Sequence, residues 1–470
     1  MPNAIQFPGE AQSNAARQII HQLEPAALRT FTPSQAVFAH SAGPFHFTPE
    51  GRKLYDYSSG VLVANLGHNP KRWTQRFGQY MGWQPEFFGG PLASDDEYLE
   101  TTTLTAYNGI TEVETKAVQR LAASLQKTPG GQRLDTIMWA ASGSEAIQKA
   151  LWAALGKDRT RDVILATRYG FHGKKGLSNA ITGSEKDAER DPRVRFISFP
   201  MEEIADHTYD FDGLDLSRFA NELEALKHQF GRRLSCLITE PYLGGGGSYH
   251  PPVAYHQVLQ KFCRENDLLF LFDEVQANFG RTGKMYAFEK YQVEPDMVIL
   301  GKGLGNGVPV AAVALNRAVA SLMKFGEASD TWSANPLACA AVLATLDEFE
   351  GRDVLKHAET LTPMFFEGLD RLKETGLIKH VRGEGMVFGI ECTAMGDYSA
   401  AEVAAEIVKE CYQGEDGVGV HFLGALAGKV LRVSPPLTIT HEQAQHSLDL
   451  VYSLLSRLAD RLNAPVLANA

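Results

Sequence analysis

The sequence is short of cysteine, of long apolar runs and of basic residues, and each shortage excludes a class of protein. Its five cysteines form no Cys-x-x-Cys pair, which excludes a disulfide-stapled fold and a zinc knuckle and indicates a reducing compartment. No apolar stretch reaches the roughly 18 residues that a membrane helix needs. The N-terminus lacks the basic head and apolar run of a signal peptide. We therefore expect a cytoplasmic protein.

The balance of charge limits the kinds of partner. The chain has 45 Lys and Arg residues against 56 Asp and Glu residues, a net charge of −11. Such an acidic chain is unsuited to nucleic acid or to an anionic membrane surface, although a local basic pocket can still bind a small anion. With 470 residues, of which 44% are hydrophobic, the chain is long enough for two lobes around a sizeable core. An enzyme with small-molecule partners is the class that remains.

Short apolar runs alternate with helical patterns through the middle of the chain. The runs that we predict as strands are 134–140, 161–167, 234–240, 268–275, 297–303 and 310–316. Helical patterns occupy 144–155 and 256–266. Continuous apolar strands between amphipathic helices are typical of a mostly parallel sheet that is covered by helices on both faces. This α/β plan places ligands beyond the carboxyl ends of the strands.

The two ends of the chain have a different pattern. Residues 45–60 resemble a hairpin with its turn at Pro49–Gly51, and the C-terminal part alternates helices and strands. We predict a smaller α+β domain built from residues 1–75 and 336–470, and a large domain over residues 76–335.

Four features follow predicted strands and could carry chemistry. Asp273 and Glu274 end the most apolar strand, and Lys302 follows the next one among glycines. The segment 141–146 puts Ser-Gly-Ser at a helix start, where free N–H groups attract phosphate. The segment 169–173 adds an aromatic ring and a histidine at a loop mouth.

Each feature also has an ordinary structural explanation. Asp273 and Glu274 could cap the next element, and Lys302 could be a solvated loop lysine. Ser-Gly-Ser could be a simple helix cap, Phe171 a core residue and His172 a structural histidine. Together, however, an amine, an acid, a phosphate cup and an aromatic ring are the set that a flat phosphorylated aldehyde requires. Pyridoxal 5'-phosphate is such a cofactor.

The segment 271–313, LFDEVQANFGRTGKMYAFEKYQVEPDMVILGKGLGNGVPVAAV, closely resembles the signature of class III pyridoxal-phosphate aminotransferases. This family includes ornithine, acetylornithine, 4-aminobutyrate and ω-amine transaminases. Further blocks fall in the family's order, among them ASGSEA, YGFHG, ITEP, TWSANPLACAA, VRGEGMVFGIE and LRVSPPLTIT. The resemblance therefore extends from about residue 50 to 455. It implies a fold-type-I transferase that works as a homodimer.

The resemblance implies roles for individual residues. Lys302 would form the Schiff base with the cofactor and move the proton, and Asp273 would keep the pyridine nitrogen protonated. Arg432 would bind a substrate carboxylate, with Tyr57 and Leu62 lining the pocket. The other cofactor-binding residues implied are Ser142, Gly143 and Ser144 at the phosphate, Phe171 on the ring face, His172, Glu240, Gln276 near the ring hydroxyl, and Thr331 from the neighbouring subunit.

The sequence departs from many family members at one position. Ornithine and 4-aminobutyrate enzymes read EP-x-Q-x-E-G-G, and the second glutamate pairs with the arginine. Here EPYLGGGG occupies 240–247, so Gly245 stands in place of that glutamate. We therefore expect Arg432 to lack this partner, and either to bind carboxylate in both half-reactions or to swing out to solvent in one. Ornithine becomes a less favoured substrate, and an ω-amine or β-amino acid a more favoured one.

We predict a ping-pong aminotransferase that moves an amino group from an amine or amino acid to an oxo acid. The same residues occur in racemases, aminomutases and a decarboxylase of the family, and these reactions remain alternatives. A binding protein that keeps the fold without catalysis is an alternative of another class. The histidines of HEQAQH are spaced at i and i+5 rather than i and i+4, so the sequence offers no metal motif.

Overall fold

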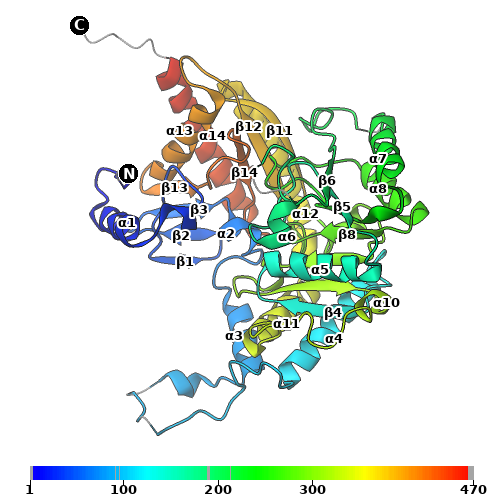
Figure 1. Cartoon of the computed structure of the whole chain (residues 1–470). Coiled ribbons are helices and arrows are strands. Elements are labelled where there is room, and N and C mark those ends of the chain that lie inside the picture. The colour runs from blue at the N-terminus through cyan, green and yellow to red at the C-terminus, as the bar shows by residue number, and fades with distance from the viewer. Residues whose placement is uncertain (1–3, 90–91, 95, 188–190, 212, 464–470) are drawn as a thin grey trace.

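A seven-stranded sheet forms the centre of the structure, a computed structural model that describes residues 4–89, 92–94, 96–187, 191–211 and 213–463 (Figure 1). The strands, in spatial order, are β4 (Thr136–Ala140), β10 (Ala311–Leu315), β9 (Met297–Leu300), β8 (Leu269–Asp273), β7 (Leu234–Thr239), β5 (Val163–Thr167) and β6 (Val194–Ile197). Only β10 runs antiparallel to its neighbours. The predicted α/β fold with a mostly parallel sheet is confirmed.

The six predicted strands of this sheet are all present, and one further strand was not predicted. β6 carries the sequence VRFI, with a half-exposed arginine between buried neighbours. It lies at the edge of the sheet and pairs only with β5. An edge strand with a polar residue lacks the continuous apolar run by which the other strands were identified.

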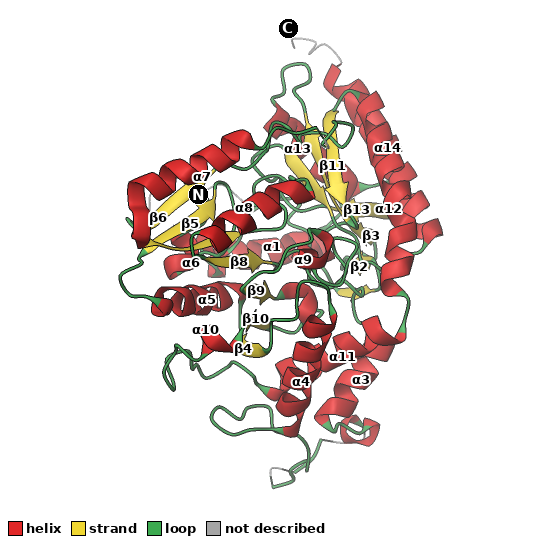
Figure 2. Cartoon of the chain, turned by 90° about the vertical axis from the view of Figure 1, so that its right-hand side faces the viewer, coloured by secondary structure: helices red, strands yellow, loops and turns green. Residues whose placement is uncertain are grey.

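Helices cover both faces of the sheet, as Figure 2 shows for α7 and α8 on one side of the strands and α5 on the other. One face is covered by α5 (Gly143–Lys157), α6 (Gly176–Ala180) and α10 (Arg317–Ala320). The opposite face is covered by α4 (Glu112–Lys127), α7 (Ser217–Phe230), α8 (Val253–Glu265) and α11 (Pro336–Gly351). Alternate residues of each strand belong to opposite apolar clusters, which is the two-sided burial of a parallel sheet.

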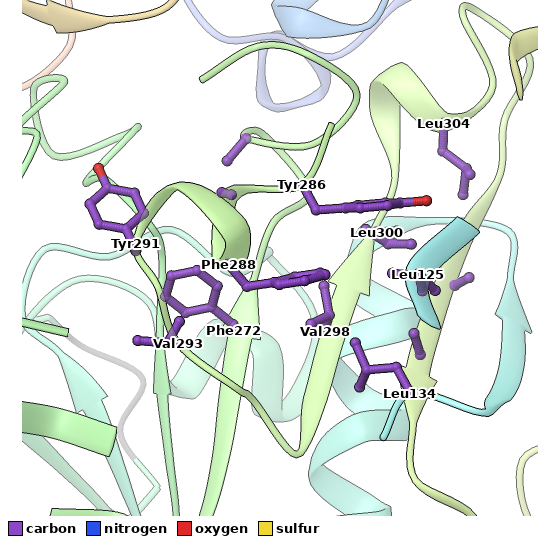
Figure 3. Close-up of a cluster of buried hydrophobic side chains, with 14 of the residues drawn as sticks. Leu125, Leu134, Phe272, Tyr286, Phe288, Tyr291, Val293, Val298, Leu300 and Leu304 are labelled. Carbon is purple, nitrogen blue, oxygen red and sulfur yellow. The ribbon is translucent and has the colours of Figure 1, made fainter. Parts of the chain in front are cut away.

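Aromatic residues pack tightly behind the strand ends that carry Asp273 and Lys302. Phe272 and Leu300, the last apolar residues of β8 and β9, are completely buried in this cluster (Figure 3). The rings of Tyr286 and Phe288 stack with their centroids 5.4 Å apart. A close-packed layer of this kind fixes the backbone from which the polar side chains project.

A second lobe combines both ends of the chain. Its four-stranded sheet contains β1 (His40–Ala42), β2 (Phe45–Phe47), β3 (Lys53–Asp56) and β13 (Val418–His421). Its antiparallel three-stranded sheet contains β11 (Ile378–Glu384), β12 (Val387–Cys392) and β14 (Val430–Val433). The parallel pairing of β3 with β13 joins the N-terminal and C-terminal parts. The longer helices of these parts are α1 (Ala11–Leu23), α12 (Val354–Asp370), α13 (Ala400–Gln413) and α14 (His441–Asn463).

Helix α11 begins at residue 336, where we placed the start of the C-terminal part of the small domain; this boundary stays a prediction. This helix contacts α4 and α3 (Lys71–Met81) and contributes to the apolar cluster of the central sheet. The remaining short helices are α2 (Ser59–Leu62), α9 (Ala287–Lys290), η1 (Ala26–Leu28), η2 (Pro85–Phe88), η3 (Gly231–Arg233), η4 (Lys302–Leu304) and η5 (Arg371–Thr375). None of the helices in the described ranges combines the length and apolar character that crossing a membrane requires.

Candidate active site

The loops that follow β4, β5, β7, β8 and β9 meet at one edge of the central sheet. These loops, together with the last residue of β8 and the first turn of α5, carry the predicted residues Ser144, His172, Glu240, Asp273 and Lys302. Because β4 and β9 both run antiparallel to β10, all five strands point their carboxyl ends the same way. This is the edge at which open α/β sheets bind ligands.

Lys302 begins the 3₁₀ turn η4 with a φ of 48°. This left-handed conformation is unusual for a lysine and is typical of strained functional positions. Burial and the charge of Arg432, opposed by the charges of Asp273 and Glu240, lower the pKa of the amine to about 8. Near neutral pH the amine is therefore partly uncharged, which makes it an available nucleophile.

Asp273 forms a hydrogen-bonded pair with His172. His172 Nδ1 lies 2.7 Å from Asp273 Oδ2, and the Val275 N–H donates to Asp273 Oδ1 at 3.0 Å. Burial opposes protonation of His172, but the hydrogen bond and the charge of Asp273 outweigh it and raise its pKa. His172 Nε2 is buried and has no hydrogen-bond partner among the described residues. The histidine thus orients the carboxylate from behind.

Glu240 supports the loop that carries Phe171. Its Oε2 accepts a hydrogen bond of 2.8 Å from the Phe171 N–H. Burial raises the pKa of Glu240 to about 7, with Asp273 adding to the effect and His172 opposing it. The ring of Phe171 remains partly exposed, so it presents a flat apolar face at the strand ends.

Arg432 on β14 reaches the site from the second lobe. Its Nη1 donates to Gln276 Oε1 at 2.8 Å, while its Nε is buried without a hydrogen-bond partner in the described chain. Burial lowers the pKa of Arg432, against the charges of Tyr242 and Glu240. Because of Gly245 we expected Arg432 to lack the glutamate partner of other family members. The contact found at this arginine is the neutral carboxamide of Gln276, and how Arg432 behaves in the two half-reactions stays a prediction.

The four glycines at 244–247 leave no room for side chains. A Cβ on Gly245 would lie 2.9 Å from Phe171 Cβ, and one on Gly244 would lie 2.4 Å from Gln276 Oε1. A glutamate at position 245 would therefore displace Phe171. The absence of a glutamate at position 245 and the position of the Phe171 ring therefore depend on each other.

The N-terminus of α5 lies where we predicted the phosphate cup. Ser142 Oγ accepts from the Glu145 N–H at 3.4 Å, so this hydroxyl serves as an ordinary helix cap. The first N–H groups of a helix have no partner within it, which leaves those of Gly143 and Ser144 to bind an anion. A Cβ on Gly173 would lie only 2.3 Å from Ser144 Oγ, so the glycine keeps space around the cup.

These residues fit pyridoxal phosphate. The available amine of Lys302, the carboxylate of Asp273, the flat face of Phe171 and the N-terminus of α5 supply the four contacts that the group needs.

The structure places three predicted residues differently from the rest. Tyr57 is completely buried, with its hydroxyl 2.8 Å from Ser447 Oγ. Leu62 is also buried. Both pack inside the lobes, and the exposed residues of this stretch are Gly60 and Val61, so the role of Tyr57 and Leu62 in binding substrate stays a prediction.

Thr331 lies on an exposed loop. The loop is tied to α5 by Lys149, whose Nζ donates to Asp330 Oδ2 at 2.6 Å and to Ser333 Oγ at 3.0 Å. Thr331 therefore projects from a fixed position toward the surface. The role of Lys149 was not predicted, because a lysine within an amphipathic helix usually indicates a solvent-exposed side chain.

Val275 is another residue that sequence analysis missed. It follows Asp273 by two positions, and its side chain lies where Cβ atoms on Gly143 and Gly301 would contact it at 3.2 and 3.3 Å. It thus fills the space between the helix start and the lysine turn. The sequence feature that could have identified Val275 is its position between two predicted residues, Asp273 and Gln276.

Comparisons with known proteins agree with this geometry. The family model for class III aminotransferases matches residues 96–455. Acetylornithine aminotransferase of Caldanaerobacter subterraneus is 35% identical over 239 residues, which span 51% of this chain and only 58% of that protein. Acetylornithine aminotransferase of Agrobacterium fabrum is 29% identical over 433 residues, which span 91% of this chain and 96% of that protein.

A solved structure shows the same fold over nearly the whole chain. The amine transaminase of an uncultivated Pseudomonas species, in its PLP-bound form, superposes with a TM-score of 0.76 at 22% identity and covers 98% of this chain and 99% of that one. The resemblance seen in the sequence is confirmed. The chain belongs to the class III aminotransferase family and is a pyridoxal-phosphate-dependent aminotransferase.

Proposed function

We propose that Lys302, Asp273 and Arg432 carry out transamination between an amine or amino acid donor and an oxo-acid acceptor. The observation that supports this proposal best is the strained, half-buried Lys302 with its lowered pKa, positioned among Asp273, Glu240 and Arg432. A solvated loop lysine would have neither feature.

Each residue has a distinct task. When bound, pyridoxal phosphate supplies an electron sink that stabilises negative charge on the substrate carbon. Asp273, held by His172, keeps a proton on the pyridine nitrogen through its negative charge. The Lys302 amine would take a proton from the donor's carbon and pass it to the bound cofactor, and would carry a proton the opposite way in the half-reaction with the oxo acid. Phe171 covers the ring, and the helix start at Gly143 and Ser144 holds the phosphate.

Arg432 defines the acceptor, and the surrounding acids define the donor. A guanidinium donates two parallel hydrogen bonds to a carboxylate, so we assign the oxo-acid carboxylate to Arg432. The carboxylates near Arg432 already accept hydrogen bonds within the protein. Glu240 accepts one from the Phe171 N–H, and Asp273 accepts one from His172. Neither is free to pair with a second ammonium group. We therefore infer a donor whose far end is neutral or anionic.

A half-reaction screen tests this proposal. The cofactor-loaded enzyme is mixed with single donors, and the loss of its visible cofactor band is followed. Ornithine and N2-acetylornithine form a matched pair that differs in one free ammonium group. We expect acetylornithine and simple amines to react and ornithine to react at least ten times more slowly. An equal rate for the two would contradict the inferred donor class.

We also propose that the working unit is at least a homodimer. The segment between α3 and α4 projects from the body of the molecule (Figure 1). Large apolar side chains are exposed along it and beside Thr331, namely Phe88, Leu92, Tyr98, Leu99, Leu104, Tyr107, Ile110, Phe325 and Trp332. Exposed apolar surface of this extent is typical of an interface. The exposure of Thr331 suits a residue that completes the neighbouring subunit's phosphate cup.

Light scattering on the active enzyme tests the assembly. We expect a mass of two or four chains, and a Thr331→Ala variant that keeps this mass but binds cofactor more weakly. An active monomer would contradict the proposal.

The reducing compartment stays part of our proposal. All five cysteines are buried and free, which is typical of cytoplasmic proteins. We therefore place the enzyme in the cytoplasm.

A further inference from the structure

Two histidines and an aspartate meet in the second lobe, in a group that the catalytic residues do not include. His46 lies on β2, Asp56 ends β3, and His68 follows in the next loop. His68 Nε2 is 2.7 Å and His46 Nε2 is 3.3 Å from the same oxygen, Asp56 Oδ2. These three atoms all lie within 4.8 Å of one another.

Outer contacts hold the three side chains in this arrangement. Ser41 Oγ lies 2.7 Å from His46 Nδ1, which leaves Nε2 of that ring facing the centre. The other carboxylate oxygen, Asp56 Oδ1, accepts bonds of 2.7 Å from both N–H and Oγ of Ser58. The backbone of His68 exchanges two hydrogen bonds with Gly43. Such outer partners are typical of metal ligands, because they fix the ring orientation and the tautomer.

The group is buried, and no lysine or arginine among the described residues forms an ion pair with it, although the charge of Arg281 acts on Asp56 from further away. His46 is 4% and Asp56 1% exposed. Among the described residues, only the two histidines form ion pairs with Asp56. A fourth imidazole, His421, stands opposite Asp56 in the parallel register of β13 and β3. It is also buried, and its Nδ1 has no hydrogen-bond partner in the described chain.

A second group of similar composition provides a contrast. Asp206, His207 and Asp370 also cluster, but Lys373 Nζ lies 3.0 Å from Asp206 Oδ2 and 2.5 Å from Asp370 Oδ1. The lysine already supplies the positive charge there. At Asp56 no lysine or arginine among the described residues has that role.

We propose that His46, Asp56 and His68 bind a divalent transition-metal ion, for which Zn²⁺ is the best match. Two imidazoles and one carboxylate form a zinc donor set that leaves a fourth position for water or a further imidazole. Ligand atoms around tetrahedral zinc lie about 3.3 Å apart. The separation of His46 from Asp56 already matches this value, and that of His68 needs to open by about 0.6 Å. Calcium and magnesium require mostly oxygen ligands and do not suit this set.

The ion would act as a structural clip. Asp56 is followed within three residues by a turn in which Ser59, Gly60, Val61 and Leu62 all have positive φ, between 47° and 67°. Four consecutive left-handed residues store strain. An ion on Asp56 would anchor the entrance to this turn and tie β2 to the loop at His68. The inference does not depend on the substrate or on the catalytic roles proposed above.

Metal analysis of the intact holoenzyme tests the proposal. The wild type, His46→Gln and the control His207→Gln are loaded with Zn²⁺, dialysed and analysed by mass spectrometry for bound zinc. We expect one equivalent per chain in the wild type and in the control, and at least a tenfold loss in His46→Gln. Replacement by Co²⁺ should give the ligand-field bands of a four-coordinate ion in the wild type and in His207→Gln, but not in His46→Gln.

A chelator experiment covers the case in which His46→Gln fails to fold. EDTA should remove the zinc from the wild type and lower its Tm, while the cofactor absorbance stays, and added Zn²⁺ should restore the Tm. Substoichiometric zinc in a folded wild type with no response of Tm to Zn²⁺ would overturn the proposal. An equal loss of zinc in His46→Gln and His207→Gln would overturn it as well.

Discussion

Arg432 Nη1 donates to Gln276 Oε1 at 2.8 Å, and this bond joins the second lobe to the loop that follows β8. The partner is a neutral carboxamide, so the guanidinium keeps its full charge for an incoming carboxylate. A carboxylate at the same place would cancel that charge and would have to be displaced by the substrate. The hydrogen bond to Gln276 therefore holds Arg432 only weakly, and the guanidinium remains able to bind a substrate carboxylate.

Replacing Arg432 by Ala should weaken binding of the oxo acid selectively. We expect KM for the acceptor to rise by about 10–100-fold, equivalent to about 1.5–3 kcal/mol for a charge-assisted contact. KM for a donor amine without a carboxylate should change much less. Steady-state kinetics with each substrate varied separately measures this, with the exposed Arg371→Ala as control. Equal impairment of both substrates would indicate that Arg432 only packs the lobes together.

Gln276→Glu should install the charged partner that this chain lacks. The new carboxylate lies within reach of Arg432 and competes with the oxo acid, so KM for the acceptor should rise about tenfold while KM for a simple amine stays within twofold. Isothermal titration with a substrate-like dicarboxylate gives an independent measure of the same competition. Unchanged acceptor binding would show that the Gln276 contact does not tune Arg432.

Lys302→Ala should abolish turnover, by at least a thousandfold, because no other amine replaces the nucleophile and proton carrier. The exposed Lys284→Ala, whose lysine pairs only loosely with Glu289 at 3.7 Å, should remain active. Borohydride treatment followed by peptide mass spectrometry should find the cofactor attached to Lys302 in the wild type and in Lys284→Ala. Full activity in Lys302→Ala would contradict the assignment.

Glu240 should make the stability of the cofactor-free protein fall as the pH rises. The folded state keeps its proton up to a pKa of about 7, whereas its ordinary value is 4.5. The stabilisation is thus fully present below pH 4.5 and is lost as the pH rises through 7. Relative to Glu240→Gln, the wild type should lose roughly 3 kcal/mol of unfolding free energy across this range. Urea unfolding at pH 4.5 to 8 measures the difference, and parallel curves for both proteins would contradict it.

The sequence predicted the residues that follow buried strands, but not which residues contact each other across the fold. Asp273 and Lys302 stand directly after continuous apolar runs, so their position at one sheet edge followed from the parallel topology. Gln276 and Arg432 are 156 residues apart, and no local pattern reports that they touch. The same holds for His46 and His68, which come together through the pairing of short strands.

Tyr57 shows why an aromatic residue beside a predicted site is hard to interpret. It lies next to the strained turn 59–62, yet its side chain points into the core and bonds Ser447. The direction in which a side chain of a short segment points depends on the φ of each residue in that segment. Positive φ values at successive positions cannot be recognised from the amino-acid composition.

The bond between Tyr57 and Ser447 spans 390 residues of chain. A ribosome that adds roughly 5–20 residues per second needs about 20–80 s to cover that distance. During this time β3 has no partner for the edge that β13 later occupies, because β13 has not yet been made. Unpaired strand edges invite pairing with other chains. The N-terminal segment must therefore wait exposed on the nascent chain, so it is where a chaperone would be needed most and where truncated products would aggregate.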